Sequence, residues 1–441
     1  MSCTVTTTVG YIDLATFSEI EAFTYGGDEA ITYFVRGVQK GNWFTQVPVC
    51  VRNDGQHGFG QRNAGVRLNR QGDYVLQALY RCKMPVLTHS VVAGSTIRYC
   101  RNLMHNLFSR ITLTFNELVL VEFDNYFLDM RHQFRTEAAK RVAYRNAIGD
   151  HSGMTTGVAC DNTTPLGTGE WHSLRLPFWF GDDSGSALPV AALPFNEVKI
   201  NYDYRMLADL LVLITAAGVT SQPLLSNLTA TAASSLEVSE PTTICHYAIV
   251  HQDERAKMGD APRDMLIDQI QTAQTAAVTA NSNTFDLRMS HAVVAIFFAL
   301  RNSTVASEWS NYTTAPLDAN AGASGSDPIG NWKLVYENTD RLNYPADYFS
   351  RDVPLMYSCT APEETGYHAW FYSLDWTSPD MSGSTNFGKL ANVSVTYTFS
   401  AAGAASLVAA APNTQTYTQA LVVINKNICR ISNGSLGLPI L

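Results

Sequence analysis

The segment Gly181-Asp182-Asp183-Ser184-Gly185 resembles the turn around the nucleophile of a serine protease. A serine nucleophile needs a histidine base that a carboxylate orients, and His172 lies close in the sequence. No pattern places these two side chains together, and Asp, Ser and Gly are ordinary turn residues. We therefore predict a hairpin turn and no catalytic residue.

Histidines and cysteines could bind metal ions, but their spacing does not favour it. The ten histidines never take the H-x-x-x-H or H-E-x-x-H spacing, and the eight cysteines include no C-x-x-C pair. Glycine motifs that bind phosphate are also missing. We expect no metal and no cofactor, and dispersed cysteines predict reduced, mostly buried thiols. The residues considered include His57, His105, His132, His246, His251 and His291, and Cys3, Cys50, Cys82, Cys100, Cys160, Cys245, Cys359 and Cys429.

Carboxylate pairs and tryptophans are the remaining candidates. The pairs Asp253-Glu254 and Glu363-Glu364 lie in segments without a clear period, so we interpret them as solvated loop charge, although a catalytic pair can also come from two different strands. Scattered tryptophans usually belong to the core, but they can also stack on sugars. An alternative function is thus a two-domain β-sandwich protein that binds or cleaves carbohydrate, with Trp171, Trp309, Trp332 and Trp376 as its candidates.

The charge balance argues against direct contact with nucleic acid. The net charge is −9, and phosphate backbones are bound by clustered Lys and Arg. The densest basic stretch, Arg131 to Arg145, is interleaved with Glu137 and apolar residues, so we predict a solvated helix face. Only 16% of the residues are charged against 46% hydrophobic ones, which predicts that part of the surface contacts protein.

Neither a secretory signal nor a membrane span is predicted. The first residues, MSCTVTTTVG, are polar and lack an apolar core. The longest apolar candidate, Leu207 to Val219, contains Asp209 and is shorter than the ~18 residues that a spanning helix needs.

Two segments far apart alternate strictly between apolar and polar residues. Residues 198–204 place Val198, Ile200, Tyr202 and Tyr204 on one face, and residues 393–399 place Val393, Val395, Tyr397 and Phe399 on one face. A period of two predicts strands with one buried face. The surrounding sequences FNEVKINYDY and LANVSVTYTF align without a gap, which suggests two copies of one β module.

The remaining pattern predicts an all-β protein with short helices in the connections. We count roughly eight strands in each half, one of them early in the chain at Ile31 to Val35. Helices are expected at Asp124 to Ala147 and at Pro262 to Thr275, and a shift to Ala, Ser, Thr, Leu and Pro between Arg205 and Thr242 predicts a domain boundary. Irregular strand spacing with long polar loops favours two β-sandwiches of Greek-key or jelly-roll type.

Short motifs along nearly the whole chain carry a family resemblance. The chain resembles the major capsid proteins of nucleocytoplasmic large DNA viruses, and most closely those of iridoviruses. The motifs are Tyr25-Gly26-Gly27, Tyr33-Phe34, Phe59-Gly60-Gln61, Gly72-Asp73-Tyr74, Met104-His105-Asn106-Leu107, Phe127-Leu128-Asp129, Leu176-Pro177, Ala187-Leu188-Pro189, Asn196-Glu197-Val198, Gly383-Ser384-Thr385-Asn386-Phe387-Gly388 and Arg430-Ile431-Ser432.

This resemblance implies a double jelly roll of two eight-stranded sandwiches in one chain. We expect an N-terminal arm at residues 1–25, a first jelly roll at 26–225 and a second at 226–441. Three chains would form a pseudo-hexameric trimer that tiles an icosahedral shell, with outward loops at 149–169, 215–241 and 302–331.

The resemblance also implies a non-enzymatic protein whose partners are other proteins. We expect contacts with further copies of itself and with minor capsid, cement and vertex proteins, and an indirect relation to an internal viral membrane. The protein would be found in the virion shell, and in the host cytoplasm during assembly.

Overall fold

The computed structural model describes residues 7–231, 236–258, 262–316, 325–358, 360–409 and 414–439. The chain divides into two compact units, Met1–Trp43 and Phe44–Leu441. In the first unit the described residues form the helix α1 (Thr7–Ala15) and the 3₁₀ helix η1 (Glu21–Phe23). The strand predicted at Ile31 to Val35 is wrong, because these residues form bends and loop without a strand partner.

The first sandwich of the main unit has two large sheets, and the second of them contains the strand predicted at residues 198–204. Tyr80 of one sheet packs against Phe108 and Tyr202 of the other, with ring centroids 5.0 and 5.2 Å apart. One sheet has the order β1 (Phe44–Val51), β15 (Ser239–Val250), β4 (Tyr74–Lys83), β10 (Trp171–Leu176), and the other β2 (Asn53–Asp54), β3 (Ala64–Arg67), β11 (Val198–Tyr204), β7 (Phe108–Phe115), β8 (Leu118–Phe123).

Two small sheets extend the first sandwich, and two of the expected outward loops contribute strands to them: the loop predicted at 149–169 contributes β9, and the loop predicted at 215–241 contributes β13 and β14. The loop predicted at residues 149–169 holds a short helix and the strand β9, so it is partly ordered. The orders are β13 (Thr220–Ser221), β12 (Leu211–Ile214), β6 (Thr96–Tyr99), β9 (Val158–Ala159), and β14 (Leu228–Ala230), β5 (Leu87–His89).

The second sandwich repeats this plan with its own strands. Phe298 stacks on Trp332 of the opposite sheet with ring centroids 4.1 Å apart. One sheet has the order β16 (Arg263–Thr272), β25 (Tyr417–Ser432), β19 (Ala292–Asn302), β22 (His368–Phe371), with β17 (Ala277–Val278), β23 (Thr385–Asn386) and β26 (Ser435–Gly437) paired beside it; the other has β18 (Ser282–Asp286), β24 (Val393–Phe399), β20 (Ile329–Tyr336), β21 (Thr339–Pro345).

The two alternating segments are confirmed as strands, β11 and β24. Each is seven residues long, and each buries every second residue in the same pattern. Each also lies inside its sheet, because β11 pairs with β3 and β7 while β24 pairs with β18 and β20. The two strands therefore hold equivalent positions in the two sandwiches.

The helix predicted at Asp124 to Ala147 is confirmed, although it is divided into α3 (Asn125–Arg135) and α4 (Ala138–Ile148). The helix predicted at Pro262 to Thr275 is wrong. These residues form β16, which pairs with β25 from Arg263 to Thr272. Long-range pairing decides the structure there, because Met265 and Ile267 are buried while Leu266 between them is partly exposed.

Strand pairing separates the sandwiches after β15. Both β14 and β15 pair with strands of the first sandwich, and β16 starts the second after the helix α6 (Gln252–Met258). The domain boundary at residues 225 and 226 stays a prediction, but the strands at 228–250 belong to the first group of sheets. No helix of the described residues combines the length and the apolar character that crossing a membrane requires.

Candidate functional site

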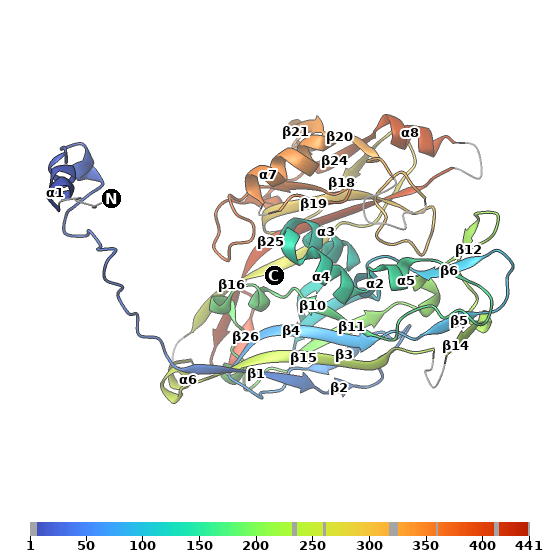
Figure 1. The fold of residues 1–441 in the computed structure, drawn as a ribbon, viewed down its shortest axis with the longest axis horizontal. Helices are drawn as coiled ribbons and strands as arrows, with labels where there is room; N and C mark the ends of the chain where they lie inside the picture. The colour runs from blue at the N-terminus through green and yellow to red at the C-terminus, as the bar shows by residue number, and fades with distance from the viewer. Residues whose placement is uncertain are drawn as a thin grey trace, which may run out of the picture. The chain divides into compact units, whose positions relative to one another are not determined.

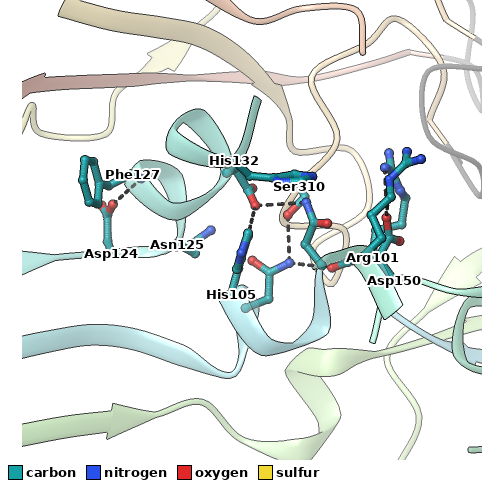
Figure 2. Close-up of polar contacts among 12 residues, drawn as sticks. Arg101, His105, Asp124, Asn125, Phe127, His132, Asp150 and Ser310 are labelled. Carbon is teal, nitrogen blue, oxygen red and sulfur yellow. Dashed lines mark hydrogen bonds and ion pairs between the residues drawn. The ribbon is translucent and has the colours of Figure 1, made fainter. Parts of the chain in front are cut away.

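The helices α2 (Leu103–Asn106), α3 and α4 of the first sandwich lie against loops of the second sandwich (Figure 1). One loop follows β19 and carries residues 303–316; the other precedes β22 and carries residues 360–367. We call this region the junction, and Figure 2 shows part of its polar contacts. Most of the buried charged side chains among the described residues lie there. It is the candidate functional site because its contacts connect the two sandwiches.

Arg98 of β6 forms an ion pair with Glu308 of the second sandwich. Both side chains are buried, with 2% and 1% of their surface exposed. Close by, Asn106 at the end of α2 donates a hydrogen bond of 2.9 Å to Ser310 Oγ of the same loop. A buried charge is tolerated only when it is paired and hydrogen-bonded, so these contacts require both sandwiches to be in place.

Glu364 is the centre of a second buried cluster. Its carboxylate accepts hydrogen bonds from Arg101 at 2.7 Å and from Arg145 at 2.9 Å, and Asp150 lies 3.6 Å from each guanidinium. Burial by itself lowers the pKa of Arg101, but Glu364 and Asp150 raise it above its ordinary value. Two cations and two anions thus neutralise each other, and the prediction that Glu364 is solvated loop charge is wrong.

Asp129 of α3 joins the two sandwiches through a chain of hydrogen bonds. One carboxylate oxygen lies 2.7 Å from His105 Nδ1, and the other accepts a bond of 3.0 Å from the hydroxyl of Tyr312 in the second sandwich. His105 Nε2 in turn lies 2.8 Å from the Tyr144 hydroxyl. An aspartate that orients a histidine is the arrangement of many catalytic bases. Here both side chains are fully buried, so no substrate can reach them.

Trp309 connects the sandwiches through its ring. The guanidinium groups of Arg205 and Arg301 lie 3.9 and 4.1 Å from the ring centroid, and the indole N–H donates to Asp209 O at 2.9 Å. A cation over an indole face is attractive by about 0.5–2 kcal/mol. Because both faces of the ring are occupied, Trp309 is not available to stack on a sugar.

The other tryptophans also argue against the carbohydrate alternative. Trp332 and Trp376 are buried and stack on Phe298 and Phe371. Trp171 is 39% exposed, but Arg81 and Lys83 lie 4.8 and 4.7 Å from its ring. The four rings are therefore distributed over the core, the junction and one surface strand rather than gathered around a groove.

The solvated face predicted for Arg131 to Arg145 is confirmed at Lys140 and Glu137, whose side chains are 71% and 63% exposed, and is wrong for the arginines, which are paired with protein groups. Arg131 donates to Asp182 at 2.6 Å, and Arg135 lies 3.4 Å from the same carboxylate. Burial by itself raises the pKa of Asp182, but Arg131 and Arg135 hold it below its ordinary value. Arg141 is buried and donates to Ala361 O at 2.7 Å. The prediction missed these partners because they are distant in sequence.

The segment resembling a protease turn is a turn, but the predicted hairpin is wrong, because the strands before and after it, β10 and β11, lie in different sheets. Ser184–Ser186 form a single 3₁₀ turn that the Asp183 carboxylate caps at Gly185 N. His172 is buried on β10, and among the described residues its two ring nitrogens have no hydrogen-bond partner. No nucleophile and base are brought together at this turn.

The remaining candidates are spread over the molecule. Asp253-Glu254 begin the exposed helix α6 rather than a loop. His57 lies between the Tyr204 hydroxyl and Gly65 O, within 3.2 Å of both. Of the cysteines in the described part of the chain, Cys50 is exposed and Cys82, Cys100, Cys160, Cys245 and Cys429 are buried, all as free thiols. Cys3 and Cys359 lie outside the described residues, which hold no group of three metal ligands.

Comparison with known proteins identifies this architecture. Residues 32–239 match the model of the major capsid protein N-terminus, and residues 254–437 match the model of the large eukaryotic DNA virus major capsid protein. The chain belongs to the family of large eukaryotic DNA virus major capsid proteins. The major capsid protein of Costelytra zealandica iridescent virus is 43% identical, with 98% of each chain covered.

Solved structures of capsid proteins have the same fold. A chain of the PBCV-1 virus capsid has a TM-score of 0.71 at 18% identity, covering 93% of this chain and all of that one. The Faustovirus major capsid protein has a TM-score of 0.72 at 12% identity, covering 94% of this chain and 96% of that one. The two sandwiches are therefore the two halves of a double jelly roll.

Membership of the family determines the role of the chain. It is a structural major capsid protein and not an enzyme, it assembles with itself into a capsid shell, and it is located in the virion. The junction has no catalytic task in such a protein. It holds the two jelly rolls in one fixed relation, which a shell needs.

Proposed function

We propose that three copies of the chain associate into a capsomer with a pseudo-hexagonal outline, and that such capsomers tile an icosahedral shell. Each chain contributes two sandwiches of similar plan, so a trimer presents six comparable modules. The equivalent positions of β11 and β24 support this duplication.

The observation that carries the proposal is the buried charge of the junction. A flexible linker between the jelly rolls would let each copy change shape, and a closed ring tolerates little variation in the angle between neighbours. Glu308 and Glu364 are both paired across the junction and buried. Separating the jelly rolls would expose unpaired charges or leave them unpaired inside, and either is costly.

We further propose that the finished capsomer contacts minor capsid, cement and vertex proteins, and that its relation to an internal membrane is indirect. The net charge of −9 disfavours direct contact with packaged nucleic acid. Assembly in the host cytoplasm fits the free thiols of Cys82 and Cys245, because cytosolic thiols stay reduced.

Light scattering coupled to gel filtration tests the trimer. A stable species near three times 48.4 kDa, with a pseudo-hexagonal outline in negative-stain images, is the expected result. A stable monomer or dimer at assembly concentrations would contradict it. The carbohydrate alternative is tested by a glycan-binding screen on the same material, and we expect no binding.

A further inference from the structure

Residues 31–38, of sequence ITYFVRGV, combine a strand-forming composition with the absence of a strand. Ile31 to Val35 are all β-branched or aromatic, the residue types enriched in strands. Yet Ile31 is 76% exposed and Phe34 97% exposed. This composition is that of a strand, and within the described residues of the first unit these residues have no strand partner.

The backbone of this segment is equally without partners. Within the described part of the chain, residues 31–41 make no backbone-to-backbone hydrogen bond, and the Phe34 N–H has only the Thr32 hydroxyl at 3.3 Å. Backbone N–H and C=O groups are strong hydrogen-bonding groups, and a row of them is a template for another strand. Both the apolar side chains and the backbone of this segment therefore require a partner strand.

The charges of the N-terminal segment favour a protein as its partner. Residues 7–29 contain five acidic residues and no Lys or Arg. In residues 30–43 the charged residues are Arg36 and Lys40, both of them basic. The acidic residues are Asp13, Glu19, Glu21, Asp28 and Glu29. Anionic lipid surfaces and nucleic acids attract basic clusters, so an acidic flank disfavours both.

The outer edge of β21 is an open template for such a strand. Within the described residues β21 pairs only with β20, and six of its seven residues are exposed, the exception being Leu342. Four other outer strands are less suitable. The strands β8 and β16 pack on each other, and α4 packs on β10. Pro48, which lacks an N–H, lies inside β1, whereas the proline of β21, Pro345, is the last residue of its strand.

Exposed apolar side chains lie on β21 and on the helix that follows it in the chain. Tyr344 of β21 packs against Tyr348, with ring centroids 4.8 Å apart, and the helix α7 (Val353–Tyr357) comes next after the turn at Tyr348–Asp352. Leu355 and Met356 of α7 are 69% and 67% exposed. Apolar side chains of an added strand would be covered there, at about 25 cal/mol per Å² of apolar surface removed from water.

We propose that residues Ile31 to Val38 of one copy add as an extra strand to the outer edge of β21 in a second copy. Strand addition to an open sheet edge is a recurring mode of recognition, in which backbone hydrogen bonds provide affinity and side chains provide specificity. The inference rests on self-assembly of the chain and not on the number of copies in the proposed capsomer.

Hydrogen–deuterium exchange on assembled full-length protein tests the pairing. We expect the amides of residues 31–38 that face β21, every second one along the strand, to exchange at least ~100-fold more slowly than in an unstructured peptide of that sequence, and the outward amides of β21 to be protected in the same sample. Fast exchange in residues 31–38 of the assembled protein overturns the proposal. Protection of 31–38 without protection of β21 overturns it as well, because the strand then pairs elsewhere.

A pair of proline variants separates strand pairing from other effects. Val35→Pro removes one N–H inside the proposed strand, and Gln39→Pro makes the same change just beyond it. We expect V35P to lose the protection of both segments and Q39P to keep it. Equal protection in the two variants contradicts the proposal.

Vesicles provide the last discrimination. Protection of residues 31–38 that appears only after addition of phosphatidylcholine–phosphatidylserine vesicles would show a lipid partner and overturn the assignment. The mass of the assembled species is measured in parallel. A trimer that forms with residues 31–38 unprotected refutes this inference alone, whereas protected residues in an assembly of another size refute the proposed capsomer alone.

Discussion

Arg98 and Glu308 form a buried ion pair although 210 positions separate them in the chain. One lies in the first jelly roll and the other in the second, so the pair reports directly on the junction. Its neighbours Asn106 and Ser310 form a hydrogen bond across the same interface. The stability of the double jelly roll should therefore depend on these polar contacts.

Removing one partner of the Arg98–Glu308 pair should be strongly destabilising. We expect Arg98→Ala and Glu308→Ala each to lower the free energy of unfolding by about 3–5 kcal/mol, because the remaining buried charge loses its partner across the junction. The double variant should lose less than the sum of the two single losses. Chemical denaturation of the full chain measures all three.

The exposed pair Arg430–Asp264 is the matched control for this cycle. Its side chains are 55% and 49% exposed, and it joins two paired strands within one jelly roll. We expect Arg430→Ala to cost much less stability than Arg98→Ala, because an exposed ion pair is screened by solvent. Similar losses of unfolding free energy for R430A and R98A would show that burial at the junction does not increase the contribution of an ion pair to stability.

The adjacent residues Glu363 and Glu364 should respond very differently to the same change. Glu364→Gln removes the carboxylate that Arg101 and Arg145 share, and we expect a loss of ~3 kcal/mol. Glu363→Gln should cost less than ~1 kcal/mol, because the Glu363 side chain is 55% exposed and lies 3.4 Å from Arg141. Thermal unfolding of the two variants side by side decides the matter, and equal melting temperatures would refute the assignment.

Asp124 should make the fold more stable in mild acid. Burial raises its pKa to about 6, although the Phe127 N–H that it caps favours ionisation. Since the folded pKa lies above the unfolded value, folding binds a proton, and this contribution to stability is lost as the pH rises from about 4 to about 6.

Asp124→Asn tests this sign, because Asn also caps helices well. We expect D124N to be more stable than the parent at pH 7, by at most ~3 kcal/mol, and nearly equal at pH 4. Urea denaturation at the two pH values provides the comparison. A variant that is less stable at pH 7 would mean that the carboxylate is ionised and needed there.

His172 should make the fold less stable in acid, which is the opposite of the effect of Asp124. Burial, and secondly the neighbouring His151, lower its pKa to about 4. A folded pKa below the unfolded one gives stability that is present above pH ~6.5 and is lost as the pH falls towards 4.

A phenylalanine at position 172 should remove this dependence. Because the ring nitrogens of His172 have no partner among the described residues, we expect His172→Phe to change the stability at pH 7 by less than ~1 kcal/mol and to flatten the acid side of the profile. His132→Phe is the control, since it deletes the contact of 3.2 Å with the Thr136 hydroxyl and should be destabilising already at pH 7. Equal acid sensitivity of H172F and the parent would disprove the role of His172.

The periodic elements could be predicted from the sequence, and the junction could not. Residues 198–204 and 393–399 alternate between apolar and polar side chains, and this local pattern made the strands β11 and β24 predictable. Residues 262–275 carry no such strong signal, and pairing with β25 makes them a strand.

The charged residues show the same limit. Nothing near Glu364 in the sequence distinguishes it from Glu363, and its burial depends on arginines 219 and 263 positions away. The stretch from Arg131 to Arg145 appeared solvated for the same reason. A local pattern indicates which face of an element is apolar, but not which distant partner neutralises a charge.

The pairing of β1 with β15 places Phe44 opposite Val250. During synthesis the chain grows from its N-terminus, so β1 leaves the ribosome long before its partner exists. The first jelly roll cannot complete this sheet until residue 250 has emerged, and until then β1 and β4 expose unpaired edges. Since long-range strand pairing is slow and such edges aggregate, the order of synthesis makes the first half of the chain the part that most needs protection by a chaperone.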